Sequence, residues 1–481
     1  MENNENSKTK VASSFFWVLV ERFGYSGINL LSMVILARLL TSYEFGLIGT
    51  ITIITSISNM IIESGLGASL VNKKNINQKD YNTVFTFNLL MSFLLYILIF
   101  TFAPSIASYF GEIILADIIR VLSLTLIFNA FSVIQRVILI KNLLFKKQSF
   151  ISILSLLISV SISIFAATKG WGTWAIVLQL VLYSGIYSVF VFFTIKYIPR
   201  IQFSLKSFKE LFGFGGRVMI SGVIQVSYSD IISSVISKVY AIQTTGLYTQ
   251  SQKLIGFPVY FFRSLFDGAA FPILSKINDK NDFKRMVSQI NRGIYLLAFP
   301  LLIAIPFNSK EIIKIVLGEH WIEANKIFTI LSMGVIVSLV DVATFSTLKS
   351  AGESKSFLSL GTAKAIIGVS LLSVTFLFDI EVLLYGIIFT NIMTMIMAIH
   401  YVGILTLYKV KEQLKDIFIP FIIAMVANII AFYTVKNLNL NKEIISLIMY
   451  IVITFLIFIF QCFLFNIQEF KLIINKIGLK I

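Results

Sequence analysis

Hydrophobic positions along the chain form long continuous blocks, and short polar segments separate one block from the next. Each block approaches the ~20 residues that a helix needs to cross the hydrocarbon core of a bilayer. The blocks lack the alternation of apolar and polar residues that marks the strands of a membrane barrel. Because only helices and closed barrels satisfy their backbone in lipid, the pattern predicts an all-α polytopic membrane protein.

Counting the blocks predicts about 14 transmembrane helices. The ninth block is short and contains two prolines, which makes its limits the hardest to place. The predicted spans cover residues 14–37, 45–68, 82–104, 113–138, 150–168, 172–195, 215–237, 247–273, 293–308, 325–348, 357–378, 382–407, 417–436 and 444–466.

The segment Ala37–Val71 joins the first two spans and sets the pattern for the chain. A basic residue, Arg38, ends the first span, and a polar turn follows it. Thr41 and Glu44 have the spacing of a capping box, so the Thr41 hydroxyl is expected to accept from the first amides of the next helix.

A related segment occurs two hundred residues later, which predicts an internal duplication. The matched pairs are Arg38 with Lys238, Gly46 with Gly246, and Glu63 with Arg263. Six predicted spans in each copy place the start of both copies on the same side of the membrane. We therefore expect two parallel six-helix lobes related by an axis along the membrane normal, plus two extra C-terminal helices.

This organisation divides the chain into four predicted parts. Residues 1–202 form the N-terminal lobe, and residues 203–214 form an interfacial linker helix, since apolar and basic residues occupy different faces of it. Residues 215–408 form the C-terminal lobe. Residues 409–481 hold the extra helices 13 and 14 and a basic tail.

Composition narrows the class of function. Hydrophobic residues make up 57% of the chain and charged residues 13%, which is outside the range of soluble domains. The net charge of +16 arises mostly from loops on the side of the N-terminus, a distribution that indicates cytoplasmic termini rather than nucleic-acid binding. His320 and His400 share no metal-ligand spacing, and Cys462 is a single cysteine, so neither a metal site nor a disulfide framework is expected.

Polar residues inside spans one, two, seven and eight are the candidate functional groups. An intramembrane charge is costly, so each one needs a partner or a function. The four spans hold equivalent places in the two copies, which predicts a water-filled cavity between the halves. Its candidate residues are Arg22, Ser26, Asn29, Asn59, Glu63, Tyr228, Asp230, Tyr260, Arg263 and Asp267.

Several of these groups also have a purely structural interpretation. Arg263 and Asp267 are four residues apart and are placed to neutralise each other on one helix. Glu63 has a place near a membrane face from which its side chain can reach water. Asp341 and Lys364, in spans ten and eleven, are predicted as an interhelical ion pair.

The short outer loops and the absence of a GxxxxGK[ST] motif argue against a membrane glycosyltransferase, a polymerase or an ATP-hydrolysing chain. A membrane scaffold needs no charges within its spans, whereas this chain has several. The sequence thus favours a transporter over an enzyme.

The stretch ARLLTSYEFGLIG (Ala37–Gly49), with ESGLGASLVNKKNINQKDYNTVFTFN (Glu63–Asn88), resembles the Wzx-type flippases of surface polysaccharides and O-antigen. These form a polysaccharide transporter branch, including the colanic-acid exporters, of the multidrug/oligosaccharidyl-lipid/polysaccharide exporter superfamily. The resemblance implies a multi-pass protein of the bacterial cytoplasmic membrane. It also implies that an undecaprenyl-diphosphate-linked oligosaccharide moves from the inner to the outer leaflet, as in lipopolysaccharide or capsule biosynthesis.

The resemblance further assigns roles to individual residues. It implies that Arg22 and Arg263 hold the diphosphate, and that H⁺ or Na⁺ is coupled through Glu63, Asp230 or Asp267. No cofactor is implied, and the transport unit is expected to be a monomer that works beside a polysaccharide polymerase and chain-length machinery. A cation-coupled multidrug exporter and a lipid II flippase of the same superfamily remain the alternatives.

Overall fold

The structure is a computed structural model of the whole chain. It describes residues 2–63, 65–266, 270–277, 279–438, 442–467 and 469–470. Within these ranges the side chains of residues 2–15, 63, 271–272, 354–355 and 357–358 are outside the description.

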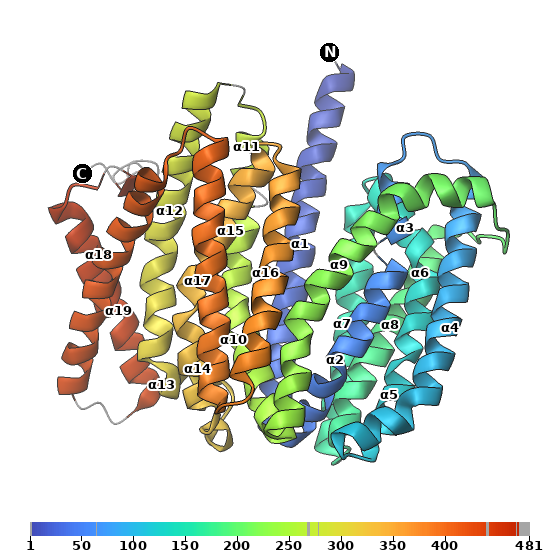
Figure 1. Cartoon of the computed structure of the whole chain (residues 1–481), viewed down its shortest axis with the longest axis horizontal. Coiled ribbons are helices and arrows are strands. Elements are labelled where there is room, and N and C mark those ends of the chain that lie inside the picture. Colours follow the sequence, from blue (N-terminus) through green and yellow to red (C-terminus); the bar gives the residue numbers. More distant parts are fainter. Residues whose placement is uncertain are drawn as a thin grey trace. The chain divides into compact units, whose positions relative to one another are not determined.

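Helices account for nearly all of the described chain (Figure 1). They are α1 (Glu2–Leu39), α2 (Ser42–Glu63), α3 (Gly65–Asn72), α4 (Gln78–Phe110), α5 (Ile114–Leu122), α6 (Leu124–Lys141), α7 (Phe145–Thr168), α8 (Thr173–Ile195), α9 (Leu205–Val239), α10 (Ile242–Leu265), α11 (Phe271–Leu274), α12 (Lys280–Phe307), α13 (Ser309–Val316), the 3₁₀ turn η2 (Glu319–Trp321), α14 (Ala324–Met333), α15 (Val335–Ser350), α16 (Ser354–Thr375), α17 (Ile380–Leu405), α18 (Val410–Asn437) and α19 (Glu443–Leu464).

The chain forms two compact units, residues 1–249 and residues 250–481. In the first unit α7 packs between α1 and α8, α6 packs against α8 and α4, and α9 packs against α2 and α3. Figure 1 shows α4, α6, α7 and α8 side by side with their axes nearly parallel. The segment predicted as an interfacial linker forms the first turns of α9.

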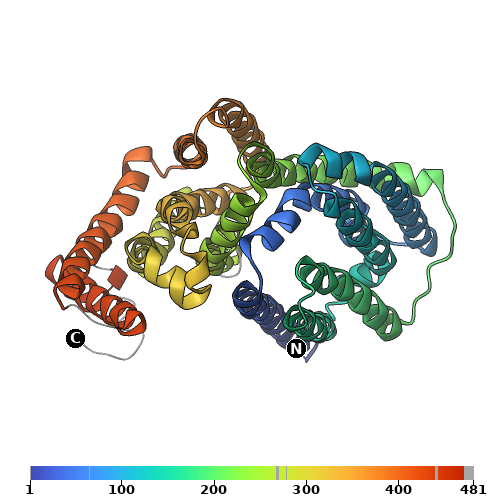
Figure 2. The ribbon, with the colours of Figure 1, turned by 90° about the horizontal axis from the view of Figure 1, so that it is seen from below.

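In the second unit α12 and α19 both pack against α18, while α17 packs between α15 and α16. Figure 2 shows many of these helices end on. The short ninth predicted span belongs to a longer helix, because α12 begins at Lys280, where the Asp279 carboxylate accepts from the amides of Asn281 and Asp282. The cap precedes the apolar block, so the predicted span, which began at residue 293, started later than the helix does.

Local chemistry sets the helix ends. Asn77 and Asp80 form a complete capping box at the start of α4, each side chain accepting from the other's backbone amide. At α2 the Glu44 half of the predicted box is confirmed, since its carboxylate accepts from the Thr41 amide at 2.6 Å. The Thr41 hydroxyl donates to the same carboxylate at 3.1 Å.

Large apolar side chains lie on the outside of the helices as well as in the core. Leu31 is 63% exposed, Phe193 74% and Phe460 65%, in contrast to the wholly buried Leu47 and Phe299. Soluble proteins rarely expose apolar surface on this scale. The outer surface therefore suits contact with lipid, and the chain is a multi-pass membrane protein.

Twelve helical segments among the described residues are long and apolar enough to cross a membrane. Each corresponds to one of the predicted spans, although two spans are interrupted, between α5 and α6 and between α14 and α15. The two remaining predictions, residues 247–273 and 357–378, coincide with α10 and α16, which do not meet the same criterion. The helical membrane fold is confirmed, whereas the count of about 14 remains a prediction.

Candidate functional site

The start of α10 crosses α2 at two glycines that touch the opposite backbone, all within the first unit. A Cβ added at Gly46 would lie 1.9 Å from the carbonyl oxygen of Ile242, and one added at Gly246 would lie 1.8 Å from that of Ser42. Real Cβ atoms do not approach backbone oxygens this closely, so only glycine fits at either position.

The two contacts are reciprocal in the numbering of the internal repeat. Gly246 follows Gly46 by two hundred residues, and Ile242 follows Ser42 by the same interval. Gly46 touches Ile242, and Gly246 touches Ser42, which is the residue equivalent to Ile242. A two-fold relation between two similar segments produces such a pair of equivalent contacts. The two segments therefore meet symmetrically at this crossing, while the duplication of the whole lobes remains a prediction.

Hydroxyl groups continue the contact between α2 and its neighbour α9. The Thr50 and Ser237 hydroxyls lie 2.7 Å apart, and the Ser234 hydroxyl donates to the Thr50 carbonyl at 2.8 Å. A hollow of about 430 Å³ opens beside Thr50 and Ser234, lined mostly by apolar residues of α2 and α4. Helix contacts made by small and hydroxylated residues are typical of membrane interiors.

On α1 the predicted cation Arg22 is exposed, and Ser26 and Asn29 are partly exposed on the same helix. The neighbouring Glu21 is turned toward α7, where its carboxylate accepts from the Gln148 side chain at 3.3 Å. The Glu21 carboxylate is thus bonded to α7, on a different side of α1 from the exposed Arg22.

Three other predicted cavity residues already have neighbours inside the first unit. The Asn59 side chain accepts from the Asn129 amide of α6 at 2.8 Å. Tyr228 and Asp230 are partly exposed on α9 and lie within electrostatic range of the fully buried Tyr248. These polar residues of α2 and α9 therefore have neighbours on α6 and α10, which their spacing in the sequence did not predict.

In the second unit Arg263 is exposed and Tyr260 is 40% exposed, both on α10. The charge of Arg263 acts on the buried carboxylate of Asp341 in α15. The Lys364 ammonium on α16 donates to Asp341 at 3.0 Å, which confirms the predicted interhelical pair. The hydroxyl of Thr394 on α17 donates to the same oxygen at 3.5 Å.

Two predicted acids cannot be placed. Asp267 lies outside the described residues, and so does the side chain of Glu63, whose backbone ends α2.

A second charged cluster in the same unit was not predicted. The buried Asp416 of α18 accepts from Arg292 of α12 at 2.5 Å, from the Tyr408 hydroxyl at 2.6 Å and from the Ser288 hydroxyl. Arg292 also bonds Glu469 at 2.6 Å. Burial raises the pKa of the Tyr408 hydroxyl, and the negative charge of Asp416 raises it further. Asp416 directly precedes the predicted span 417–436, and an acid at that position could have indicated a charged partner on another helix.

No group of three or more His, Cys, Asp and Glu side chains in the described ranges has the arrangement of a metal site. Cys462 is buried with a free thiol. The expectation that the protein needs no metal and no cofactor remains a prediction.

Sequence comparisons find proteins of polysaccharide biosynthesis. Residues 35–326 match the family described as "Polysaccharide biosynthesis protein". The teichuronic acid biosynthesis protein TuaB of Bacillus subtilis is 23% identical over 72% of this chain and 72% of its own length. The succinoglycan biosynthesis transport protein ExoT of Rhizobium meliloti is 23% identical over 68% of this chain and 66% of its own.

Among solved structures, the lipid II flippase MurJ in an inward closed conformation is similar in fold. The TM-score is 0.74 at 17% sequence identity, over 94% of this chain and 99% of that one. At this level of identity the similarity concerns the arrangement of the helices alone.

Proposed function

Because the chain belongs to the polysaccharide biosynthesis protein family, we propose that it is a flippase for a lipid-linked oligosaccharide. In this proposal an undecaprenyl-diphosphate-linked repeat unit moves from the inner to the outer leaflet of the bacterial cytoplasmic membrane, for export of a surface polysaccharide. The family match over residues 35–326 is the observation that carries the proposal. The similarity to TuaB, a teichuronic acid biosynthesis protein, and to ExoT, a succinoglycan biosynthesis transport protein, supports the same function.

Arg22 and Arg263 are our proposed diphosphate ligands. Both side chains are exposed rather than packed into the helix bundle. A guanidinium presents a planar fork of donors that matches phosphate oxygens, and such charge-assisted bonds are stronger than neutral ones. Ser26, Asn29, Asn59, Tyr228 and Tyr260 supply the hydroxyl and amide groups that a glycan needs.

The glycine crossing is the proposed closed gate of this transporter. Arg38 and Lys238 precede Gly46 and Gly246 by eight residues on the side opposite the predicted cytoplasmic termini. The contact of α2 with α10 would thus seal the outer side while the substrate is loaded from the inner side. Alternating access then requires that the two glycines separate and meet again in each cycle.

Ion coupling and partners complete the proposal. A coupling H⁺ or Na⁺ would bind an intramembrane acid, and Asp230, partly exposed on α9, is the candidate whose side chain is described. Glu63 and Asp267 remain candidates on the basis of the sequence. We keep the monomer as the transport unit and a polysaccharide polymerase with its chain-length machinery as the partners.

Deletion of the gene tests this function directly. Surface polysaccharide and lipid-linked repeat units on the inner leaflet are measured in the same cells. The proposal predicts loss of surface polymer together with accumulation of inner-leaflet units. Normal polymer with new sensitivity to cationic drugs would instead indicate a multidrug exporter, and accumulation of lipid II would indicate a peptidoglycan precursor flippase.

The site itself is tested by Arg22→Ala and Arg263→Ala in the complemented deletion strain. Each should lower surface polymer at least tenfold at equal membrane abundance, because a diphosphate loses a charged donor pair. Arg285→Ala is the matched control, since Arg285 is 74% exposed and pairs only loosely with Asp282 at 3.9 Å. Full activity of both variants would remove these arginines from the site.

A further inference from the structure

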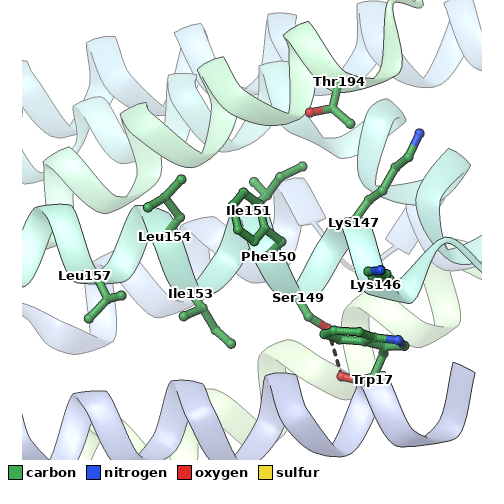
Figure 3. A pocket seen from close by; sticks show the side chains of 10 residues that line it. All are labelled: Trp17, Lys146, Lys147, Ser149, Phe150, Ile151, Ile153, Leu154, Leu157 and Thr194. Carbon is green, nitrogen blue, oxygen red and sulfur yellow. Dashed lines mark hydrogen bonds between the residues drawn. The ribbon is translucent and has the colours of Figure 1, made fainter. Parts of the chain in front are cut away.

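A groove on the first unit is not used by the proposed transport mechanism. It has a volume of about 570 Å³ and runs along α7, with contributions from one residue each of α1 and α8 (Figure 3). Its lining residues are Trp17, Lys146, Lys147, Ser149, Phe150, Ile151, Ile153, Leu154, Leu157 and Thr194.

The chemistry of the groove changes from one end to the other. Figure 3 shows Lys146, Lys147 and Trp17 at one end, with Lys147 directed toward the side of Thr194, and Leu154 and Leu157 at the other end. The apolar residues follow successive turns of α7, so they form a continuous track away from the lysines. A ligand that matches this surface carries negative charge at one end and an apolar chain behind it.

The basic end is a built structure rather than a pair of free side chains. The buried Ser149 hydroxyl donates to the Trp17 carbonyl at 2.8 Å and so ties α1 to α7 at this point. The Lys146 ammonium lies 5.3 Å from the centre of the Trp17 ring, a cation–π distance. The indole and one ammonium are thereby held next to each other.

Among the described side chains, the two lysines at this end have no acidic partner. Across the ranges that the structure describes, neither Lys146 nor Lys147 forms an ion pair with a carboxylate. Both side chains are exposed, and the two charges are adjacent in sequence. An anion placed between them would gain two charge-assisted contacts.

The groove opens outward, where membrane lipid has access. Phe150 is 66% exposed and Leu157 is 45% exposed, whereas Ile151 beneath them is 4% exposed. Tryptophan and lysine together at the end of a membrane helix are typical of the level of the lipid headgroups. The basic end therefore lies at headgroup depth, and the apolar track lies at the depth of the acyl chains.

We propose that this groove binds one anionic phospholipid of the surrounding membrane. Its phosphate lies between the Lys146 and Lys147 ammonium groups, its ester region lies against the Trp17 indole, and one acyl chain lies along Ile153, Leu154 and Leu157. This site is separate from the proposed diphosphate ligands Arg22 and Arg263 and does not depend on the transport function.

The lining explains why the occupant is a phospholipid rather than the lipid-linked sugar. An oligosaccharide needs many hydroxyl and amide partners. Ser149 and Thr194 are the uncharged polar residues that line the groove. Ser149 is already bonded to the carbonyls of Trp17 and Phe145, and Thr194 to the carbonyl of Phe190. A glycan would therefore find few partners here.

Photocrosslinking of the full-length protein in nanodiscs tests the site. A photoactivatable phosphatidylglycerol probe should label a peptide within residues 145–157, and unlabelled phosphatidylglycerol should compete with it. Lys146→Gln and Lys147→Gln should each weaken competition about fivefold, from the attraction of one basic residue for an anionic lipid. Leu157→Trp should also lower labelling, since the indole would occupy the apolar track.

Controls separate a specific site from general attraction to the membrane. Lys206→Gln with Lys209→Gln removes two exposed lysines from the start of α9 and should leave labelling unchanged. Lys147→Arg keeps the charge and should retain labelling, while elution as a single species in gel filtration shows that each variant is folded.

Three results would overturn the proposal. The first is equal labelling of the same peptide by a photoactivatable phosphatidylcholine. The second is unchanged labelling in the double lysine variant. The third is stronger competition by undecaprenyl phosphate than by phosphatidylglycerol at equal mole fraction, which would assign the groove to the substrate lipid. The assay measures lipid binding and not transport, so its result tests the groove independently of the proposed flippase activity.

Discussion

Two helix contacts in this protein hold their helices together by opposite means. In the first unit α2 meets α10 through the backbone, because Gly46 and Gly246 present no side chain. In the second unit α12 meets α18 through the buried carboxylate of Asp416, which binds Arg292 and Ser288 of α12. The first contact forms because the two glycines have no side chain, and the second is held by an ion pair between Asp416 and Arg292.

The difference suggests which contact can move. A glycine crossing is smooth and involves no charge, so it opens without leaving an unpaired ion in lipid. Separation of Asp416 from Arg292 would leave the buried Asp416 carboxylate without its cation, which costs several kcal/mol. We therefore expect the glycine crossing to open during transport, whereas the charged cluster keeps α18 attached to the second unit throughout.

The largest expected effect is that of Gly246→Leu or Gly46→Leu. Any Cβ at these positions would lie within 2 Å of a carbonyl oxygen of the other helix, so the crossing cannot form. Overpacking a tight contact typically costs about 1–3 kcal/mol, and a clash with the backbone lies at the upper end of that range. Surface polymer in the complemented deletion strain should fall to the level of the deletion.

Gly213→Leu is the matched control for the glycine variants, because a Cβ at Gly213 of α9 would have no heavy atom within 4 Å. It should keep normal membrane abundance and normal polymer. If Gly46→Leu and Gly246→Leu behaved like Gly213→Leu, the crossing would not be a required contact.

The second largest effect is expected for Asp416→Ala. Its loss leaves Arg292 without one partner and removes the acceptor of the Tyr408 and Ser288 hydroxyls. Breaking a buried ion pair costs about 3–5 kcal/mol, and the lower value applies because Arg292 is 28% exposed and keeps Glu469. The thermal midpoint in detergent should fall by several degrees, and an unchanged midpoint would contradict the account.

A smaller effect is expected for the Asp341–Lys364 pair, where a double-mutant cycle gives the sharpest result. Lys364→Met leaves the buried Asp341 carboxylate without its cation and should cost about 2 kcal/mol. Adding Asp341→Leu removes the stranded charge and should restore most of that loss. Additive losses in the double variant would mean that the 3.0 Å contact does not contribute.

The smallest effect is expected for Asn129→Ala on α6. The variant removes one partly buried hydrogen bond, that of the Asn129 amide with Asn59, and should cost about 1 kcal/mol in thermal unfolding. Transport should persist if Asn59 mainly contacts the glycan. A loss as large as that of the glycine variants would make the Asn59–Asn129 contact part of the gate.

The sequence predicted the membrane helices because hydrophobic length is a direct physical requirement of the bilayer. It also predicted the pairing of Asp341 with Lys364. It did not predict the start of α12 at Lys280, since the first turns of that helix are polar and extend beyond the apolar block. An apolar block marks the part of a helix that lies in lipid, but it does not show how far the helix continues beyond the lipid.

The site was harder to predict because partners come from distant parts of the chain. Asn59 and Asn129 are seventy residues apart, and Arg292 and Asp416 are separated by more than a hundred. The spacing of residues along one helix shows which of them lie on the same face. It does not show which other helix that face contacts. A stripe of polar residues therefore identifies α1, α2, α9 and α10 as polar helices without distinguishing ligands from internal partners.

The most direct test of the central claim is flipping by the purified protein. Proteoliposomes are loaded with a fluorescent undecaprenyl-diphosphate-linked oligosaccharide, and its exposure on each leaflet is followed with a membrane-impermeant quencher. The account predicts protein-dependent exchange between leaflets that Arg22→Ala abolishes and Arg285→Ala preserves. Exchange no faster than in empty liposomes, with folded protein and a coupling-ion gradient of H⁺ or Na⁺ present, would contradict it.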